Sequence, residues 1–233
     1  MNEPMKRTGK GAPEGVAVAI PVRNCGEVIG RIVSETAAII PEILVVDDGS
    51  NDGTSRAAST AGARVLRLDP GRGKGAAMRC AINDIEQHSS CDWVLFMDGD
   101  GQHLPGDVPR FLEAMDDSVD FLLGNRLAEA AKIPNHRLAT NRIGSLILRF
   151  MTGEAIPDTQ CGFRAFRKSL LKEITTESNG FEIETEMLLK ALAAGAKWRS
   201  VPVRTVYEGV GSHYSAVSDT YRISMAALRY VQG

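Results

Sequence analysis

Residues 94–103 read Val-Leu-Phe-Met-Asp-Gly-Asp-Gly-Gln-His, an apolar run that ends in a polar cluster. A short, continuous apolar run is typical of a buried strand. Asp98 and Asp100 follow one residue apart and repel each other unless a cation lies between them, and such hard oxygen ligands suit Mg²⁺ or Mn²⁺. The stretch therefore predicts a strand that ends in a metal site for a diphosphate. On this stretch alone, a solvated turn is the commoner explanation, because Asp and Gly are also frequent turn residues.

Length and composition predict one soluble domain. The chain has 233 residues, of which 43% are hydrophobic and 24% charged, and its net charge of −2 gives no general attraction to nucleic acid. The four cysteines have no Cys-x-x-Cys spacing, which is typical of free thiols in a reducing compartment. We expect a flexible tail over residues 1–15 and a single domain over 16–233. We also expect a cytoplasmic protein, because no apolar run is long enough to span a membrane.

Apolar runs alternate with helical patterns in the first half, which indicates a mainly parallel sheet covered by helices on both faces. The expected strands are 16–21, 43–46, 64–68, 94–97 and 121–124, and the expected helices are 27–39, 55–61, 76–85 and 107–115. The second half predicts helices over 137–151, 181–194 and 219–231, a short strand over 163–166, and an edge strand over 201–206. Ligands of such sheets bind at the carboxyl ends of the strands.

Two loops at those ends leave alternatives open. Asp47 and Asp48 follow a predicted strand, where a carboxylate either accepts a hydrogen bond from a nucleotide or forms an Asx-turn. The glycine-rich residues 71–75 suggest a phosphate-binding loop. However, Lys74 is followed by glycine rather than by Ser or Thr, which argues against a Walker-type loop.

Several motifs occur in the order found in a known family. They are Pro-Val-Arg-Asn at 21–24, Val-Val-Asp-Asp-Gly-Ser at 45–50, Gly-Lys-Gly at 73–75, Asp-Gly-Asp-Gly-Gln-His at 98–103 and Asp-Thr-Gln-Cys-Gly-Phe-Arg at 158–164. The chain resembles inverting GT-A glycosyltransferases of the dolichyl-phosphate mannose and glucose synthase branch, with its bacterial polyprenyl-phosphate relatives. The resemblance implies a GT-A (Rossmann-like) α/β fold with a mixed, mainly parallel sheet. It also implies transfer of a hexose from a nucleotide diphosphate sugar to a polyprenyl phosphate, with Mg²⁺ or Mn²⁺.

The resemblance also implies roles for individual residues. The metal residues are Asp98, Asp100 and Gln102, and the acceptor-phosphate residues are Arg126, Arg137 and Asn141. The donor-binding residues are Pro21, Arg23, Val46, Asp48, Asp98, Gly99, Asp100, Gln102 and His213. Asp100, Arg126 and Arg137 are the expected catalytic residues. Arg23, Cys25 and Tyr207 depart from the family pattern at the donor end, so GDP-mannose and UDP-glucose both remain candidate donors.

The chemistry agrees, since a lipid phosphate is already an anionic nucleophile and arginines bind phosphate well. The helix over 137–151 carries arginines on one arc and Ile143, Leu146, Ile147 and Phe150 on the other. Such a helix either lies on a bilayer, alone or beside a membrane-protein partner, or packs its apolar side on the sheet. Two other functions stay open. One is transfer to a sugar hydroxyl with Glu182, Glu184 or Glu186 as base, and the other is a non-catalytic nucleotide-sugar-binding subunit.

Overall fold

The structure is a computed structural model that describes residues 15–127, 133 and 135–204. Apart from Gly15, the expected N-terminal tail lies outside these residues, and so does the expected last helix over 219–231. Within the described part no helix has the length and apolar character needed to cross a bilayer.

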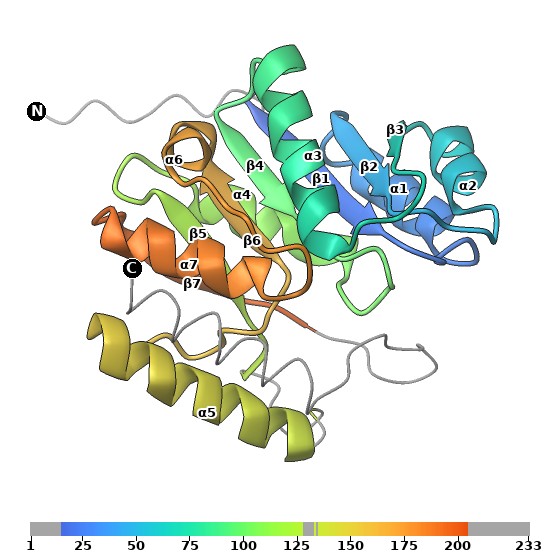
Figure 1. Cartoon of the computed structure of the whole chain (residues 1–233). Helices are drawn as coiled ribbons and strands as arrows, with labels where there is room; N and C mark the ends of the chain where they lie inside the picture. Colours follow the sequence, from blue (N-terminus) through green and yellow to red (C-terminus); the bar gives the residue numbers. More distant parts are fainter. Residues whose placement is uncertain (1–14, 128–132, 134, 205–233) are drawn as a thin grey trace, which may run out of the picture.

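Seven strands form one mixed sheet in the order β3-β2-β1-β4-β6-β5-β7 (Figure 1). The strands are β1 (Val16–Val22), β2 (Ile43–Asp47), β3 (Arg64–Arg67), β4 (Trp93–Phe96), β5 (Phe121–Asn125), β6 (Arg164–Arg167) and β7 (Trp198–Pro202). Strand β6 is antiparallel to β4 and β5, whereas the remaining pairs are parallel. This arrangement confirms the expected mixed, mainly parallel sheet. The predicted edge strand is also present, but β7 begins at Trp198 rather than at residue 201.

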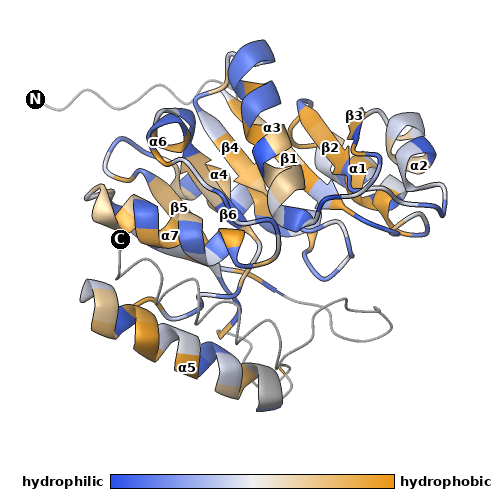
Figure 2. Ribbon diagram, in the orientation of Figure 1, coloured by the Kyte–Doolittle hydropathy of each residue, from blue (hydrophilic) through white to orange (hydrophobic). Residues whose placement is uncertain are grey.

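Helices cover both faces of the sheet. Successive side chains of a strand point to opposite faces, and in these strands the apolar side chains on both faces need to be covered. The helices are α1 (Ile29–Ala37), α2 (Thr54–Thr60), α3 (Lys74–His88), α4 (Val108–Ala114), α5 (Asn135–Thr152), α6 (Lys168–Glu173) and α7 (Ile183–Ala193), with a 3-10 turn η1 at Pro105–Asp107. Ala17 and Ala19 of β1 belong to the core under α3, α6 and α7, whereas Val18 and Ile20 belong to the core under α1 and α4. Figure 2 shows the apolar strands between these layers. Sequence patterns missed α6, since six residues are too few to display helical periodicity.

Helix α5 packs against α7 (Figure 1), and several of its apolar side chains are exposed. Among its described side chains Asn141 and Leu148 are buried, whereas Ile143, Leu146 and Phe150 are 51%, 69% and 93% exposed. Ile147 and Met151 are partly buried against the core, so the alternative in which this helix packs its apolar side inward holds for only part of that side. The helical wheel gave the angles between side chains but not the side that the rest of the protein covers.

Candidate active site

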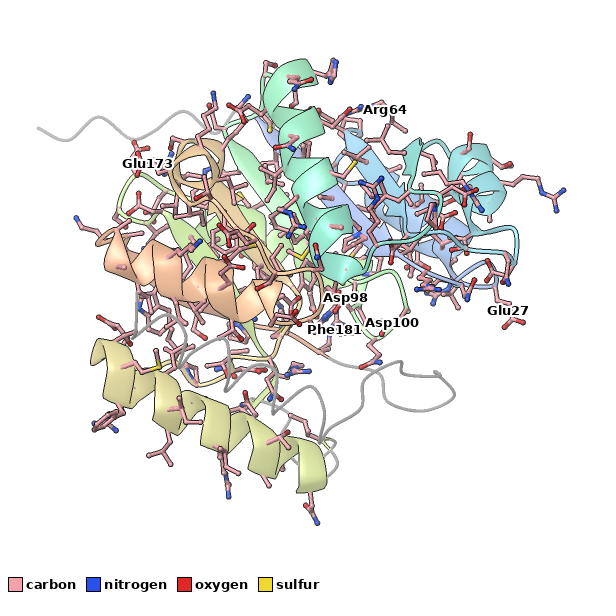
Figure 3. The ribbon with its side chains drawn as sticks, in the orientation of Figure 1. Glu27, Arg64, Asp98, Asp100, Glu173 and Phe181 are labelled. Carbon is pink, nitrogen blue, oxygen red and sulfur yellow. The ribbon has the colours of Figure 1, made fainter. Side chains whose placement is uncertain are left out.

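A cavity of about 540 Å³ opens at the carboxyl ends of β1, β2 and β4. Its volume is typical of a site for a small molecule. The residues expected at the site that line this cavity are Pro21, Arg23, Asp48, Asp98, Gly99, Asp100, Gln102 and Arg126. Figure 3 shows Asp98 and Asp100 near Phe181, which also lines the cavity and precedes α7, whereas the labelled Glu27, Arg64 and Glu173 lie elsewhere. The chain thus brings most of the expected donor-side residues together.

The remaining expected residues have other locations. Val46 lies in β2, is fully buried and does not line the cavity. Asn141 does not line the cavity either, because its Nδ2 donates to the carbonyl of Pro157 at 3.0 Å and its Oδ1 accepts from the backbone N of Thr159 at 3.1 Å. Asn141 therefore anchors the loop that precedes β6. Arg137 belongs to the first turn of α5, but its side chain lies outside what the structure describes, as does the whole of His213.

Asp98 follows the end of β4 and is held by two groups. Its Oδ1 accepts a hydrogen bond from Nζ of Lys74 at 2.6 Å, and its Oδ2 lies 3.3 Å from Nε2 of His103. Burial alone would raise the pKa of Asp98, but the charge of Lys74 and the hydrogen bond from His103 outweigh it and hold that pKa far below its ordinary value. Asp98 is therefore a carboxylate at any physiological pH.

In the part of the chain that the structure describes, both hydrogen bonds to the carboxylate of Asp100 come from the neutral Gln102. Its Oδ1 accepts from the backbone N of Gln102 and its Oδ2 from Nε2 of Gln102, both at 2.9 Å. Burial, followed by the negative charge of Asp98, raises the pKa of Asp100, so a cation at this point would relieve an unfavourable charge.

The donor set fits a hard divalent ion that is completed by a substrate. Among the described residues no group of three or more His, Cys, Asp or Glu forms a metal cluster. Mg²⁺ does not need one, because it is usually held by one or two carboxylates together with water and substrate phosphates. Asp98 and Asp100 border a cavity large enough for a diphosphate, so they match this pattern.

The two neighbouring aspartates at the end of β2 have different hydrogen-bond partners. Oδ1 of Asp47 accepts from the backbone N of Ser50 at 2.8 Å, so Asp47 stabilises the local turn, although this bond reaches one residue further than in an Asx-turn. Asp48 lines the cavity, and its carboxylate accepts from the backbone N–H groups of Arg72 at 2.5 Å and Gly73 at 2.9 Å. Asp48 thereby joins the glycine-rich loop to the wall of the cavity.

Arg126 faces the cavity in a fixed orientation. Its Nε and its NH2 donate to the two carboxylate oxygens of Asp158, each at 2.8 Å, and the side chain of Asp158 is only 1% exposed. Burial alone would raise the pKa of Asp158, but the charge and hydrogen bonds of Arg126 lower it overall. The motif at 158–164 indicated no role for Asp158, whereas in the structure Asp158 anchors the expected catalytic arginine.

Lys74 and Glu184 also line the cavity, and sequence reasoning missed their pairing. Nζ of Lys74 donates to Oε1 of Glu184 at 2.8 Å, and an NH2 of Arg164 lies 3.9 Å from Oε2 of Glu184. The glycine on each side of Lys74 indicated a close approach of this loop to another part of the chain but did not identify Glu184. A Cβ at Gly73 or Gly75 would collide with backbone oxygens of residues 178–179, so only glycines allow the loop to pack there.

Comparisons with known proteins agree with this geometry. The profile described as Glycosyl transferase family 2 matches residues 17–175. The chain belongs to this family. It is 34% identical over 195 residues to Glycosyltransferase AglJ of Haloferax volcanii, a match that takes in 82% of this chain and 62% of that protein. It is 30% identical over 204 residues to Polyprenol monophosphomannose synthase of Mycolicibacterium smegmatis, covering 80% of this chain and 75% of the relative.

A solved structure supports the fold of this family 2 glycosyltransferase. Glucosyl-3-phosphoglycerate synthase from Mycobacterium tuberculosis, in complex with Mn²⁺, UDP and phosphoglyceric acid, superposes with a TM-score of 0.72. The sequence identity is 17%, and the superposition covers 92% of this chain and 78% of that one. The fold is the expected GT-A fold.

Proposed function

We propose that this chain transfers a hexose from a nucleotide diphosphate sugar, of the GDP-mannose or UDP-glucose type, to a polyprenyl phosphate with inversion. The observation that carries the proposal is the cavity that Asp98, Asp100 and the Asp158-anchored Arg126 line together. Such a cavity can neutralise both a leaving diphosphate and an attacking phosphate. The name of the mycobacterial relative, a polyprenol monophosphomannose synthase, supports the same class of acceptor.

Asp98, Asp100 and Gln102 would hold the divalent ion, Mg²⁺ or Mn²⁺. When bound, such an ion supplies positive charge that stabilises the leaving nucleoside diphosphate. Asp48, Pro21 and Arg23 line the part of the cavity next to β1 and β2, where the resemblance puts the nucleotide base. The guanidinium of Arg126 is oriented by Asp158 and lines the cavity, where an arginine can bind phosphate oxygens.

The glutamates at the start of α7 favour a phosphate acceptor over a sugar hydroxyl. A hydroxyl acceptor needs a carboxylate base that is free to take a proton. Of the three candidates, Glu184 lines the cavity but is paired with Lys74. Glu186 accepts from the backbone N of Ser178 at 2.9 Å and lies 2.9 Å from Lys190, and Glu182 accepts from the backbone N of Gly180 at 3.1 Å. Neither Glu182 nor Glu186 lines the cavity. A lipid phosphate needs no base, because it is already ionised at neutral pH.

The acceptor is tested with matched substrates and with Arg137. Purified enzyme, a panel of GDP- and UDP-sugars and Mn²⁺ should glycosylate a polyprenyl phosphate but neither the free polyprenol nor a sugar. Arg137→Ala should raise the acceptor KM or lower kcat by about ten- to a hundredfold, the effect of losing a charged hydrogen bond. Arg137→Lys should rescue only part of this loss, because an ammonium cannot make the planar two-pronged contact. Loss of donor affinity instead would move Arg137 to the nucleotide end, and glycosylation of a hydroxyl would favour the base-assisted reaction.

We further propose that α5 holds the protein peripherally on the cytoplasmic face of a membrane. Ile143, Leu146 and Phe150 form an exposed apolar stripe, and the exposed Arg142 and Arg149 flank it. An apolar stripe beside arginines fits the boundary between acyl chains and anionic headgroups, where a lipid phosphate is presented.

Vesicle binding tests this membrane surface. The protein should sediment with anionic vesicles at low salt and less at high salt, because salt screens surface charge within about 8 Å at physiological ionic strength. Leu146→Glu should abolish sedimentation without changing thermal stability, since Leu146 is 69% exposed. Ala193→Glu, which makes the same charge change at an exposed position of α7, is the control. Equal sedimentation of both variants would exclude α5 as the contact surface.

A further inference from the structure

Lys74 is the centre of a row of alternating charges beside the expected metal site. Arg164 lies next to Glu184, Glu184 accepts from Lys74, and Lys74 donates to Asp98, which also lies beside His103. The row joins the start of α3 to the end of β4 and to the first turn of α7. It therefore links Asp98, an expected metal ligand, to two elements that carry no expected ligand.

The side chain of Lys74 is largely buried and is held by its neighbours. Its side chain is 13% exposed, and its Nζ lies 5.1 Å from the centre of the Phe181 ring. The backbone N of Gly75 donates to the carbonyl of Asn179 at 2.8 Å, which fixes the loop that carries the lysine. Burial alone would lower the pKa of Lys74, but the charges of Asp98 and Glu184 outweigh it and raise that pKa, so the ammonium stays charged.

The two oxygens of Asp98 are both engaged by these neighbours. Lys74 lies at Oδ1 and His103 at Oδ2. A divalent ion that bound Asp98 through Oδ1 would meet the ammonium at the same oxygen and would be repelled by it. Lys74 has a second carboxylate in Glu184, so it can leave Asp98 without becoming an unpaired buried cation.

We propose that Lys74 competes with the divalent ion for Asp98, so that the ion binds together with the nucleoside diphosphate rather than before it. The inference rests on the proposed function only in assuming that this site takes a divalent ion and a nucleoside diphosphate. A diphosphate changes the balance in two ways. Its oxygens add ligands for the ion, and its negative charge gives Lys74 a new partner on the cavity side. The ammonium thus keeps the carboxylates from binding a divalent ion until the donor arrives.

Mn²⁺ titrations followed by electron paramagnetic resonance test this order of binding without any turnover. Wild-type protein should bind Mn²⁺ weakly alone and more tightly with UDP or GDP. Lys74→Met should bind Mn²⁺ alone roughly tenfold more tightly than wild type, because a repelling unit charge a few ångströms away has been removed. In the same variant, UDP or GDP should increase the affinity for Mn²⁺ less than in wild type, because the ammonium that would bind the diphosphate has been removed. Lys190→Met removes the lysine that pairs with Glu186 on α7, does not change the cavity lining and is the matched control.

A double variant tests the same competition without leaving an excess negative charge that could unfold the protein. Lys74→Met alone leaves Asp98 and Glu184 without their shared cation, whereas Lys74→Met with Glu184→Gln removes one charge of each sign and the net charge is unchanged. Competition predicts tighter Mn²⁺ binding in the double variant as well. Equal or weaker binding by either folded variant would overturn the inference, because Lys74 would then support the site rather than compete for it.

If wild-type protein binds no Mn²⁺ even with nucleotide, the metal dependence of the proposed function fails as well. Normal Mn²⁺ binding without transfer to a polyprenyl phosphate would leave this inference intact and reject only the proposed acceptor.

Discussion

Asp100→Asn should lower hexosyl transfer about a thousandfold, the equivalent of roughly 4 kcal/mol of transition-state stabilisation, while the protein stays folded. The carboxylate of Asp100 lies near that of Asp98, but its two hydrogen-bond donors are neutral groups of Gln102. It is therefore the group best able to take a divalent ion. An amide has the same shape but no charge to offer.

The melting temperature of Asp100→Asn shows whether its loss of activity comes from the site or from unfolding. Burial and the charge of Asp98 raise the pKa of Asp100, which means that its ionised form is unfavourable in the folded protein. Replacing it with a neutral amide should leave the melting temperature unchanged or raise it. Asp117→Asn, at an exposed aspartate on the surface, is the control for the chemical change. Full activity of Asp100→Asn, or of wild type in excess chelator, would reject the metal assignment.

The gathering of polar residues at the carboxyl ends of the strands, and with it most of the cavity lining, could be predicted from the sequence. The apolar runs before Asp48 and Asp98 identify buried strands, and polar residues directly after parallel strands must gather at one edge of the sheet. The position of β7 was less accessible, because Trp198 pairs with Phe121 of β5 although alternation in the sequence begins only at residue 201. A short edge strand is defined by its partner as much as by its own pattern.

Contacts between distant residues were not accessible from sequence. Lys74 and Glu184 are separated by 110 positions, and no local pattern links them. The alternate spacing of Glu182, Glu184 and Glu186 predicted that at least one of them is exposed, which is wrong, because Glu184 is buried and the other two are partly buried. On α5, Asn141 turns inward because the Pro157 carbonyl and the Thr159 N–H need a partner, a requirement set by a loop that comes later in the chain. The burial of Asn141 is therefore a tertiary property.

Asp158→Asn should destabilise the protein by about 3 kcal/mol and lower transfer about a hundredfold. The pair of Asp158 and Arg126 is bidentate and almost wholly buried on the aspartate side, so the neutral amide leaves a guanidinium without its anion. Stability and activity should fall together, since the same two hydrogen bonds hold the loop before β6 and orient Arg126. Urea unfolding and steady-state kinetics measure the two effects.

The dependence on pH follows from the pKa of Asp158, which Arg126 lowers in the folded state. A carboxyl with a lowered pKa contributes stability above its unfolded pKa of about 3.9, and this contribution is lost as the pH falls through the folded value. The difference in unfolding free energy between wild type and Asp158→Asn should therefore be full near pH 7 and should shrink below about pH 4. A difference that stays constant into acid would mean that charge pairing is not its origin.

Two further variants separate the anchoring of Arg126 from the general cost of losing a buried carboxylate. Asp107 is also buried and accepts from the backbone N of Arg204 at 2.7 Å and from its Nε at 2.9 Å, but it does not line the cavity. Asp107→Asn should lose stability and keep kcat. Asp158→Asn combined with Arg126→Gln should recover part of the stability, because neither partner is left unpaired, yet stay inactive. If the double variant regained activity, or if Asp158→Asn kept wild-type kcat, Arg126 would not be the group that binds phosphate, and the acceptor side of the cavity would have to be sought elsewhere.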